Sequence, residues 1–292
     1  ICFIFFVFFV SIISIVTFIT SVTSVTSVTF ITSVTSVTSV TLFTLFTFSY
    51  LCPMPWRSRT ELIIGPDGVS RLEESHILVA GLGGVGAAAA EMLCRAGIGT
   101  LTLLDADTVA DSNRNRQLPA LCSTLGRLKT DVVGERLMDI NPALRLIRFS
   151  EYIKDEKTEN LLDAAKYDYV VDAIDTLSPK IWLIAHCVQR QLPVVSSMGS
   201  GAKLDPSQVR AVDLSETYQC TFAYDIRKRL RKLGVVSGVK AVFSPEVVIK
   251  SAIRHQEGEQ NKKSVIGTIS YMPVVFGCHC ASVVIRDLLG RS

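Results

Sequence analysis

Apolar positions between residues 54 and 292 follow two patterns that alternate along the chain. Short apolar runs, each the length of a buried strand, fall at residues 77–80, 100–104, 143–149, 169–173 and 193–197. Segments with helical spacing lie between them, including the alanine-rich stretch 87–96 and the stretch 129–140. This alternation predicts an α/β fold: a doubly wound, Rossmann-like and mostly parallel sheet with helices on both faces.

The pattern changes after residue 199, where the apolar runs become shorter and are punctuated by glycine. Residues 208–212 and 239–243 predict a short antiparallel extension of the sheet. Residues 277–289 predict a closing helix that packs back on the sheet.

The first 56 residues follow neither pattern. They contain no charged residue and no histidine, and threonine recurs at every third position from Thr17 to Thr47. A period of three keeps apolar side chains on one face of neither a strand nor a helix, so these residues are not expected to be part of the fold. We therefore divide the chain into a low-complexity leader, residues 1–53, and one domain, residues 54–292.

Three interpretations of the leader remain open. Residues 1–19 are long enough for a marginal membrane span. A secretory signal is disfavoured because no positive charge precedes Arg57. We favour a translated upstream nucleotide repeat, with the true start at Met54. On that interpretation the protein is cytoplasmic, and it is membrane-associated only if residues 1–20 are really made.

The strand at 77–80 runs directly into a glycine-rich turn. Gly81, Gly83 and Gly86 have GxGxxG spacing, with Gly84 between them. Such glycines let the backbone approach a phosphate, and the following helix start offers free N–H groups. The same glycines also occur where a helix merely packs closely on a sheet, so the motif alone leaves both readings open.

The second strand ends in Asp105, where a dinucleotide-binding fold places an acid that holds ribose hydroxyls. That aspartate alone would suggest NAD. However, Asp107, Asn115 and Arg116 follow in a polar loop for which a hydride-transfer enzyme has no obvious need.

These segments resemble a known family of adenylating enzymes. GLGGVG, LLDADTVADSNRNRQ and VVDAIDT, with Gly126 and Lys129, resemble the domain shared by ubiquitin-activating enzymes and the bacterial enzymes of molybdopterin and thiamine synthesis. GAKLDPSQVRAVDLSETY, RKRLRKLGV and VFSPE narrow the resemblance to the tRNA threonylcarbamoyladenosine dehydratases, over roughly residues 57–290.

The resemblance implies ATP and Mg²⁺ as cofactors. Arg116 and Lys129 match positions that neutralise the charge developing as pyrophosphate leaves. Asp175 is the expected metal ligand and Asp172 the second candidate, because both fall at the end of an apolar strand. The alternative reading of Asp175 is a helix N-cap. The glycines of the turn, Asp105, Asp107 and Asn115 are expected to bind the nucleotide.

The resemblance also implies partners. Arg59 matches an arginine that reaches across a homodimer into the other subunit's ATP site. Residues 227–232, RKRLRK, form a basic cluster on an expected helix whose Ala223, Ile226, Leu230 and Leu233 face inward. The cluster favours binding of tRNA phosphates, although an ordinary solvated helix face would look the same. A sulfur-relay protein is a further candidate partner.

The function implied is ATP-dependent dehydration of threonylcarbamoyladenosine next to the tRNA anticodon, through adenylation of the threonyl carboxylate. Two alternatives stay open: adenylation of the C-terminus of a ubiquitin-like sulfur carrier, and nicotinamide-dependent oxidation. The absence of any CxxC motif counts against the first alternative, because many sulfur-carrier-activating relatives hold zinc in paired CxxC knuckles. Cys220 is more simply a small buried residue than a nucleophile. Residues 278–280, Cys-His-Cys, fan out on a helix and are not expected to bind metal.

Overall fold

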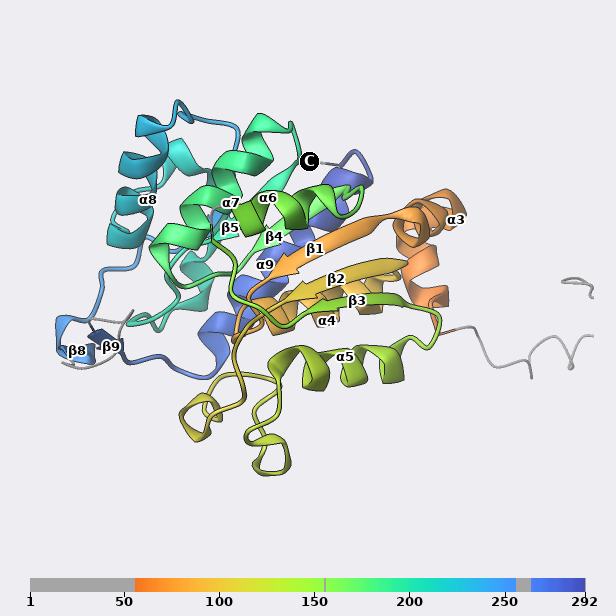
Figure 1. The fold of residues 1–292 in the computed structure, drawn as a ribbon, viewed down its shortest axis with the longest axis horizontal. Coiled ribbons are helices and arrows are strands. Elements are labelled where there is room, and N and C mark those ends of the chain that lie inside the picture. The colour runs from red at the N-terminus through yellow and green to blue at the C-terminus, as the bar shows by residue number, and fades with distance from the viewer. Residues whose placement is uncertain (1–55, 155, 256–263, 292) are drawn as a thin grey trace, which may run out of the picture. The chain divides into compact units, whose positions relative to one another are not determined.

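The structure is a computed structural model that describes residues 56–154, 156–255 and 264–291; the leader, residues 1–53, lies outside the described residues. Seven strands form one sheet in the order β3-β2-β1-β4-β5-β7-β6 (Figure 1). Their bounds are β1 His76–Ala80, β2 Thr100–Leu104, β3 Arg145–Phe149, β4 Tyr169–Asp172, β5 Val194–Ser197, β6 Arg210–Asp213 and β7 Lys240–Phe243.

Neighbouring strands from β3 to β7 run parallel, and only β6 pairs antiparallel with its neighbour β7. This arrangement confirms the predicted mostly parallel sheet with a short antiparallel extension. A separate hairpin, not anticipated from the sequence, joins β8 (Ile253–His255) to β9 (Ser264–Ile266).

Helices cover both faces of the sheet. One face carries α4, α5 and α9, and the other carries α6, α7 and α8. The helices are α3 Ser58–Glu74, α4 Gly86–Ala96, α5 Lys129–Ile140, α6 Glu156–Asp163, α7 Leu177–Gln189, α8 Thr221–Lys232 and α9 Tyr271–Leu288. None of the helices in the described ranges is both long and apolar enough to cross a membrane.

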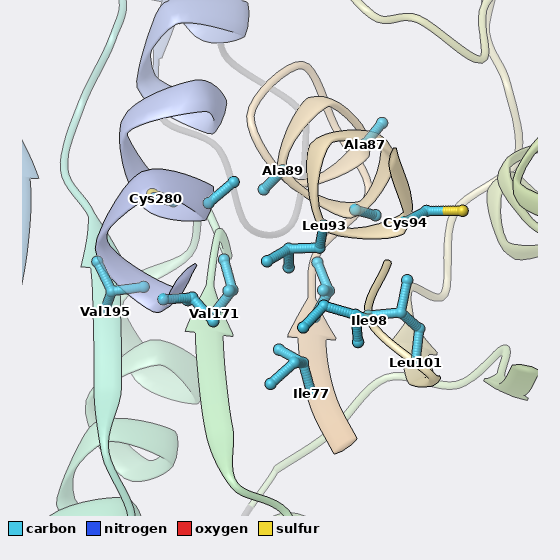
Figure 2. Close-up of a cluster of buried hydrophobic side chains, with 14 of the residues drawn as sticks. Ile77, Ala87, Ala89, Leu93, Cys94, Ile98, Leu101, Val171, Val195 and Cys280 are labelled. Carbon is cyan, nitrogen blue, oxygen red and sulfur yellow. The ribbon is translucent and has the colours of Figure 1, made fainter. Parts of the chain in front are cut away.

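The central strands are mostly apolar because both faces of the sheet are buried there, whereas the edge strand β3 is partly exposed and carries Arg145 and Arg148. Ile77 and Val79 of β1 point to the layer that holds α4 and α9, whereas Leu78 and Ala80 point to the layer that holds α7. Figure 2 shows the first of these cores, in which Ile77 and Val171 pack beneath Leu93 of α4 and Cys280 of α9. The two cores fix the central strands, and with them the loops at their carboxyl ends.

Two helices depart from the sequence expectations. The closing helix begins at Tyr271, six residues before the predicted 277, because Pro273 sits in its first turn, where a proline is tolerated. Helix α3 was not predicted at all. Its apolar spacing is interrupted by Gly65, which has a φ of 77°, and by Pro66, so the helix is kinked there.

Candidate active site at the carboxyl ends of the central strands

The strand register brings three loops together at one edge of the sheet. Ala80 at the end of β1 is level with Leu104 of β2 and with Asp172 of β4. The chain leaves β1 toward β2 and β3 on one side, and continues from β4 to β5 on the other. Loops after β1 and β4 therefore diverge, which creates the crevice where open α/β sheets bind their ligands.

The glycine turn is shaped by this crevice. Gly81 has a φ of 88°, and a Cβ there would lie 2.7 Å from the carbonyl oxygen of Ala173. A Cβ at Gly86 would lie 1.7 Å from the carbonyl oxygen of Gly81. Glycine is thus required at both positions to close the turn and to start α4 directly at the ends of β1 and β4.

The two middle glycines differ from each other. A Cβ on Gly84 would collide with Pro273, at 2.7 Å, and with the carbonyl oxygen of Arg116, at 2.9 Å. A Cβ on Gly83 would meet nothing closer than the side-chain nitrogen of Gln117, at 3.7 Å. Packing of the helix start against α9 therefore explains Gly84, whereas Gly83 borders space in which a ligand can approach the backbone.

Asp105 is held immediately beside this turn. Its Oδ2 accepts a hydrogen bond of 2.6 Å from the backbone N–H of Leu82, and its Oδ1 accepts one of 2.8 Å from that of Asp107. Burial raises the pKa of Asp105, although the Lys129 ammonium and the two N–H donors oppose the shift. Each carboxylate oxygen keeps a second lone pair, so Asp105 can still accept hydrogen bonds from a ligand.

Lys129 is buried against two carboxylates. Its Nζ lies 2.7 Å from Oδ2 of Asp107 and 3.9 Å from Oδ2 of Asp105. The lysine is the first residue of α5, where a cation is unfavourable unless an anion lies nearby. The Lys129 side chain is only 5% exposed, but that of Asp107 is 65% exposed. The ammonium is therefore fixed while one of its partners is free to be solvated.

Arg116 lies on the neighbouring loop and is held by that loop's own oxygens. Its Nη1 donates to the carbonyl of Ser112 at 2.8 Å and to Oδ1 of Asn115 at 2.7 Å. Asn115 in turn donates through Nδ2 to the carbonyl of Thr268, 2.9 Å away. Asn115 thus links the loop to the segment before α9 and orients the Arg116 side chain. Both roles are separate from the nucleotide contact expected of Asn115.

Sequence reasoning did not single out Gln117, the residue after Arg116. Its Oε1 is buried and has no hydrogen-bond partner, while its Nε2 is the side-chain atom nearest to Gly83. An unpartnered buried carbonyl is costly, so a donor supplied by a ligand would satisfy it. The signal in the sequence was only its position next to Arg116, which is too weak to distinguish it from any other loop glutamine.

The two candidate metal ligands have opposite environments. Asp172 is fully buried, pairs with Lys180 at 2.8 Å and accepts a hydrogen bond from Ser196 at 2.7 Å. Both of its oxygens are therefore engaged inside the fold, so Asp175 stays the expected metal ligand and Asp172 the second candidate. Asp175 is exposed on the loop between β4 and α7. The N-cap of α7 is Thr176, so Asp175 does not have the capping position that the alternative reading gave it.

Arg59 is not brought to the other site residues within one chain. It is exposed in the first turn of α3, the helix that leads into the amino end of β1. Figure 1 shows α3 at the opposite end of the central strands from the loops that follow them. An Arg59 that acts at this site must therefore come from a second copy of the chain.

Helix α8 carries the basic cluster as expected, with two corrections. Ala223, Ile226 and Leu230 are buried, but Leu233 is exposed because the helix ends at Lys232. Arg227 turns inward and donates to the carbonyl of Thr217, at 2.7 Å. The four remaining basic residues of the cluster are exposed along the helix: Lys228, Arg229, Arg231 and Lys232.

The three cysteines considered as candidates differ in burial. Cys220 is buried. Cys280 is buried and Cys278 exposed, so the two thiols of the 278–280 segment diverge. Within the described ranges, no three His, Cys, Asp or Glu side chains are placed to hold a metal ion together.

Fold and site together define a doubly wound α/β protein in which a glycine turn, Asp105 and Lys129 gather at the carboxyl ends of the central strands. The model of the ThiF family matches residues 57–292. The chain belongs to the ThiF family.

Several relatives share most of its length. The tRNA threonylcarbamoyladenosine dehydratase of Bacillus subtilis is 39% identical over 239 residues, which span 80% of this chain and 94% of the relative. The dehydratase of Escherichia coli is 38% identical over 66% of this chain and 76% of its own. Its crystal structure in complex with ATP superposes with a TM-score of 0.73 at 33% identity, covering 82% of this chain and 97% of that one. A complex with AMP matches with the same TM-score.

Proposed function

We propose that the protein is an ATP-dependent tRNA threonylcarbamoyladenosine dehydratase. The observation that carries the proposal is the similarity to the Bacillus subtilis enzyme over 94% of that enzyme's length, which includes the segments after β5 as well as the glycine turn. The Escherichia coli enzyme has been solved with both ATP, the substrate of an adenylation, and AMP, the group released when the adenylated carboxyl is attacked. The catalytic unit is residues 54–292.

The site residues divide the adenylation among them. The start of α4 and Gly83 receive the phosphates, and Asp105 accepts hydrogen bonds from the ribose hydroxyls. A threonyl carboxylate oxygen attacks the α-phosphorus and pyrophosphate leaves, while Lys129 and Arg116 stabilise the negative charge that develops. A nucleophilic atom of the same modified side chain then attacks the activated carbonyl, AMP leaves and a ring closes, with the net loss of one water.

Magnesium is the metal that this chemistry calls for. Mg²⁺ is bound through one or two carboxylates together with substrate phosphates rather than by an all-protein cage. Asp175 fits that requirement, since its carboxylate is exposed at the end of β4 beside the crevice. When bound, the ion would neutralise phosphate charge; Asp175 is the residue that would hold it.

The test is a single reaction. The protein produced from Met54 is incubated with Mg²⁺, ATP and tRNA, and the digested nucleosides are weighed by mass spectrometry. Loss of one water from threonylcarbamoyladenosine is the expected result. Adenylation of a ubiquitin-like sulfur carrier without any change in the tRNA would instead support the alternative activity. Absence of both products would contradict the proposal.

We further propose that the enzyme works as a homodimer in which Arg59 acts on the partner's nucleotide. Arg59→Ala and Lys129→Met are each expected to be inactive. An equal mixture that exchanges subunits should recover about a quarter of the normal activity, because half of the dimers then contain one complete site. Failure of the mixture to recover activity, with exchange shown by native mass spectrometry, would contradict action in trans.

The tRNA is proposed to contact the exposed face of α8. Replacing Lys228, Arg229, Arg231 and Lys232 by glutamine should weaken tRNA binding and reduce its salt dependence, while ATP binding stays unchanged. A sulfur-relay protein as a further partner stays a candidate that pull-down with purified proteins would test.

A further inference from the structure

The most unusual feature outside the nucleotide crevice is the ion pair between Lys180 and Asp172. Their side chains are 2.8 Å apart and both are 0% exposed. Removing two charges from water is costly, and a buried pair often stabilises a fold no better than apolar residues of the same size. A role in holding one particular conformation explains such a pair better than stability does.

The hydrogen bonds of Lys180 and Asp172 are made near the end of β4, and the Lys180 ammonium also lies over the Phe222 ring of α8, 5.9 Å from its centroid. Lys180 reaches back from the first turn of α7, and its Nζ donates to the carbonyl of Ile174 at 3.0 Å and approaches that of Asp172 at 3.5 Å. Asp172 accepts from the N–H of Ile174 at 3.2 Å and from the Ser196 hydroxyl at 2.7 Å. Residues 172–174 are thus held by Lys180 of α7 on one side and by Ser196 of β5 on the other.

The fastened segment is one wall of the nucleotide crevice. Ala173 donates its N–H to the carbonyl of Ala80 at 2.8 Å, and its own carbonyl fills the place that a Cβ on Gly81 would take. Asp175, the proposed metal ligand, follows directly. A shift of this segment would therefore displace both the backbone beneath the glycine turn and Asp175.

We propose that Lys180 is a positioning residue for the adenylation, which acts through Asp172 by fixing residues 172–175 in the conformation that receives the nucleotide. This proposal rests on the proposed function. Lys180 touches no reacting atom, and its effect should appear in how ATP is bound rather than in how tRNA is bound.

The test compares two double variants. Lys180→Met with Asp172→Asn removes the sealed pair without leaving a single buried charge. Lys240→Met with Asp287→Asn is the matched control, because it removes a lysine–aspartate pair of 2.6 Å that begins at the amino end of β7. Steady-state rates give the KM for ATP and for tRNA, and hydrogen exchange by mass spectrometry reports on residues 172–177.

We expect the first double variant to raise the KM for ATP about tenfold, as loss of a supporting contact behind a binding residue commonly does, with the KM for tRNA within about twofold of normal. Hydrogen exchange should accelerate at residues 172–177, and the control variant should show neither effect. A purely structural role would instead lower the active fraction and leave both KM values unchanged, which would overturn the proposal.

Two further measurements keep the test decisive. If the first double variant does not fold, Ser196→Ala removes one hydrogen bond to Asp172 without changing any charge, and it should move the KM for ATP and the exchange in the same direction by a smaller factor. An unchanged KM and unchanged exchange in that variant would also overturn the proposal. Calorimetry compares the affinity for ATP of the variants with that of the wild type, and so tests the role of Lys180 without the tRNA reaction. Failure of the wild-type protein to dehydrate tRNA would refute only the proposed function.

Discussion

Two lysine–aspartate clusters lie on either side of the glycine turn, and they differ in their access to solvent. Lys129 begins α5 after β2, and Lys180 lies in the first turn of α7 after β4. Lys129 shares a cluster with Asp107, whose side chain is 65% exposed, whereas both members of the Lys180–Asp172 pair are sealed. One cluster opens toward the crevice and the other is closed beneath it.

The difference shows what each cluster is able to do. Asp107 can be hydrated when it leaves Lys129, so the ammonium can exchange a carboxylate for a phosphate at modest cost. Asp172 has no such alternative, and neither partner can leave without exposing an unpaired charge to an apolar core. The open cluster is suited to binding a charged ligand, and the sealed pair to holding backbone in place.

The largest expected effect is on stability. Lys180→Met alone should lower the free energy of unfolding by about 3–5 kcal/mol, because it leaves the Asp172 carboxylate buried without its partner. Lys129→Met should lower the free energy of unfolding by clearly less, because water can solvate the exposed Asp107 carboxylate once the ammonium is gone. Urea titrations followed by circular dichroism measure both. Equal losses in the two variants would remove the distinction between the clusters.

The second-largest expected effect is on activity, where the Lys129 substitution should matter more than the Lys180 substitution. Lys129→Met should lower kcat/KM for ATP by about 10²–10³-fold, in the range found when one donor to a developing charge is removed. The initial rate of tRNA dehydration measures the change, and circular dichroism confirms that the variant is folded. An active Lys129→Met enzyme would show that the open cluster does not serve the chemistry.

Sequence patterns predicted the central strands well because both faces of the sheet are buried there, so these strands are short and mostly apolar. The segment 100–104 coincides with β2, and β1 and β4 differ from the predicted runs by one residue each. Helix α3 escaped prediction because Gly65 and Pro66 break its spacing. Its last turn is held by a local hydrogen bond from Ser75 to the carbonyl of Arg71 and by a long-range one from Arg71 to the carbonyl of Leu288 in α9.

The site was less predictable, because motifs give residue types and not environments. GxGxxG specifies three of the four glycines of the turn, and only the fold shows that Gly84, at one of its variable positions, is required by its contact with Pro273. The motif VVDAIDT ranks Asp175 above Asp172 only by position, whereas burial of Asp172 against Lys180 separates their environments. Such distinctions depend on residues distant in sequence, among them Ser196, which no local pattern links to β4.

Gln117 allows the open side of the crevice to be examined further. The unpartnered Oε1 of Gln117 can accept from a neutral donor of ATP, a ribose hydroxyl or the adenine amino group, so Gln117→Ala should weaken ATP binding about two- to tenfold, the size of one neutral hydrogen bond. Calorimetric titration with ATP measures the loss, and Gln208→Ala on the distant η3 turn, Pro206–Gln208, serves as the control. Unaltered affinity in Gln117→Ala would mean that the buried oxygen is satisfied in some way unrelated to nucleotide.

The smallest expected effect concerns pH and again involves the open cluster. Burial raises the pKa of Asp105, so as the pH falls this carboxylate takes up its proton sooner than an exposed aspartate would. Between the unfolded pKa of about 3.9 and the raised folded value, the folded state holds more protons than the unfolded chain, and the contribution of Asp105 to stability falls as the pH rises.

Hydrogen bonds from ribose hydroxyls strengthen when they are accepted by the ionised form of Asp105. ATP affinity should therefore decline on the acid side at a pH above the usual range for aspartate. Asp105→Asn should bind ATP more weakly at neutral pH and lose this acid decline. Fluorescence titrations with a labelled nucleotide across acidic pH would show both features, and an acid decline that persists in Asp105→Asn would assign it to a different group.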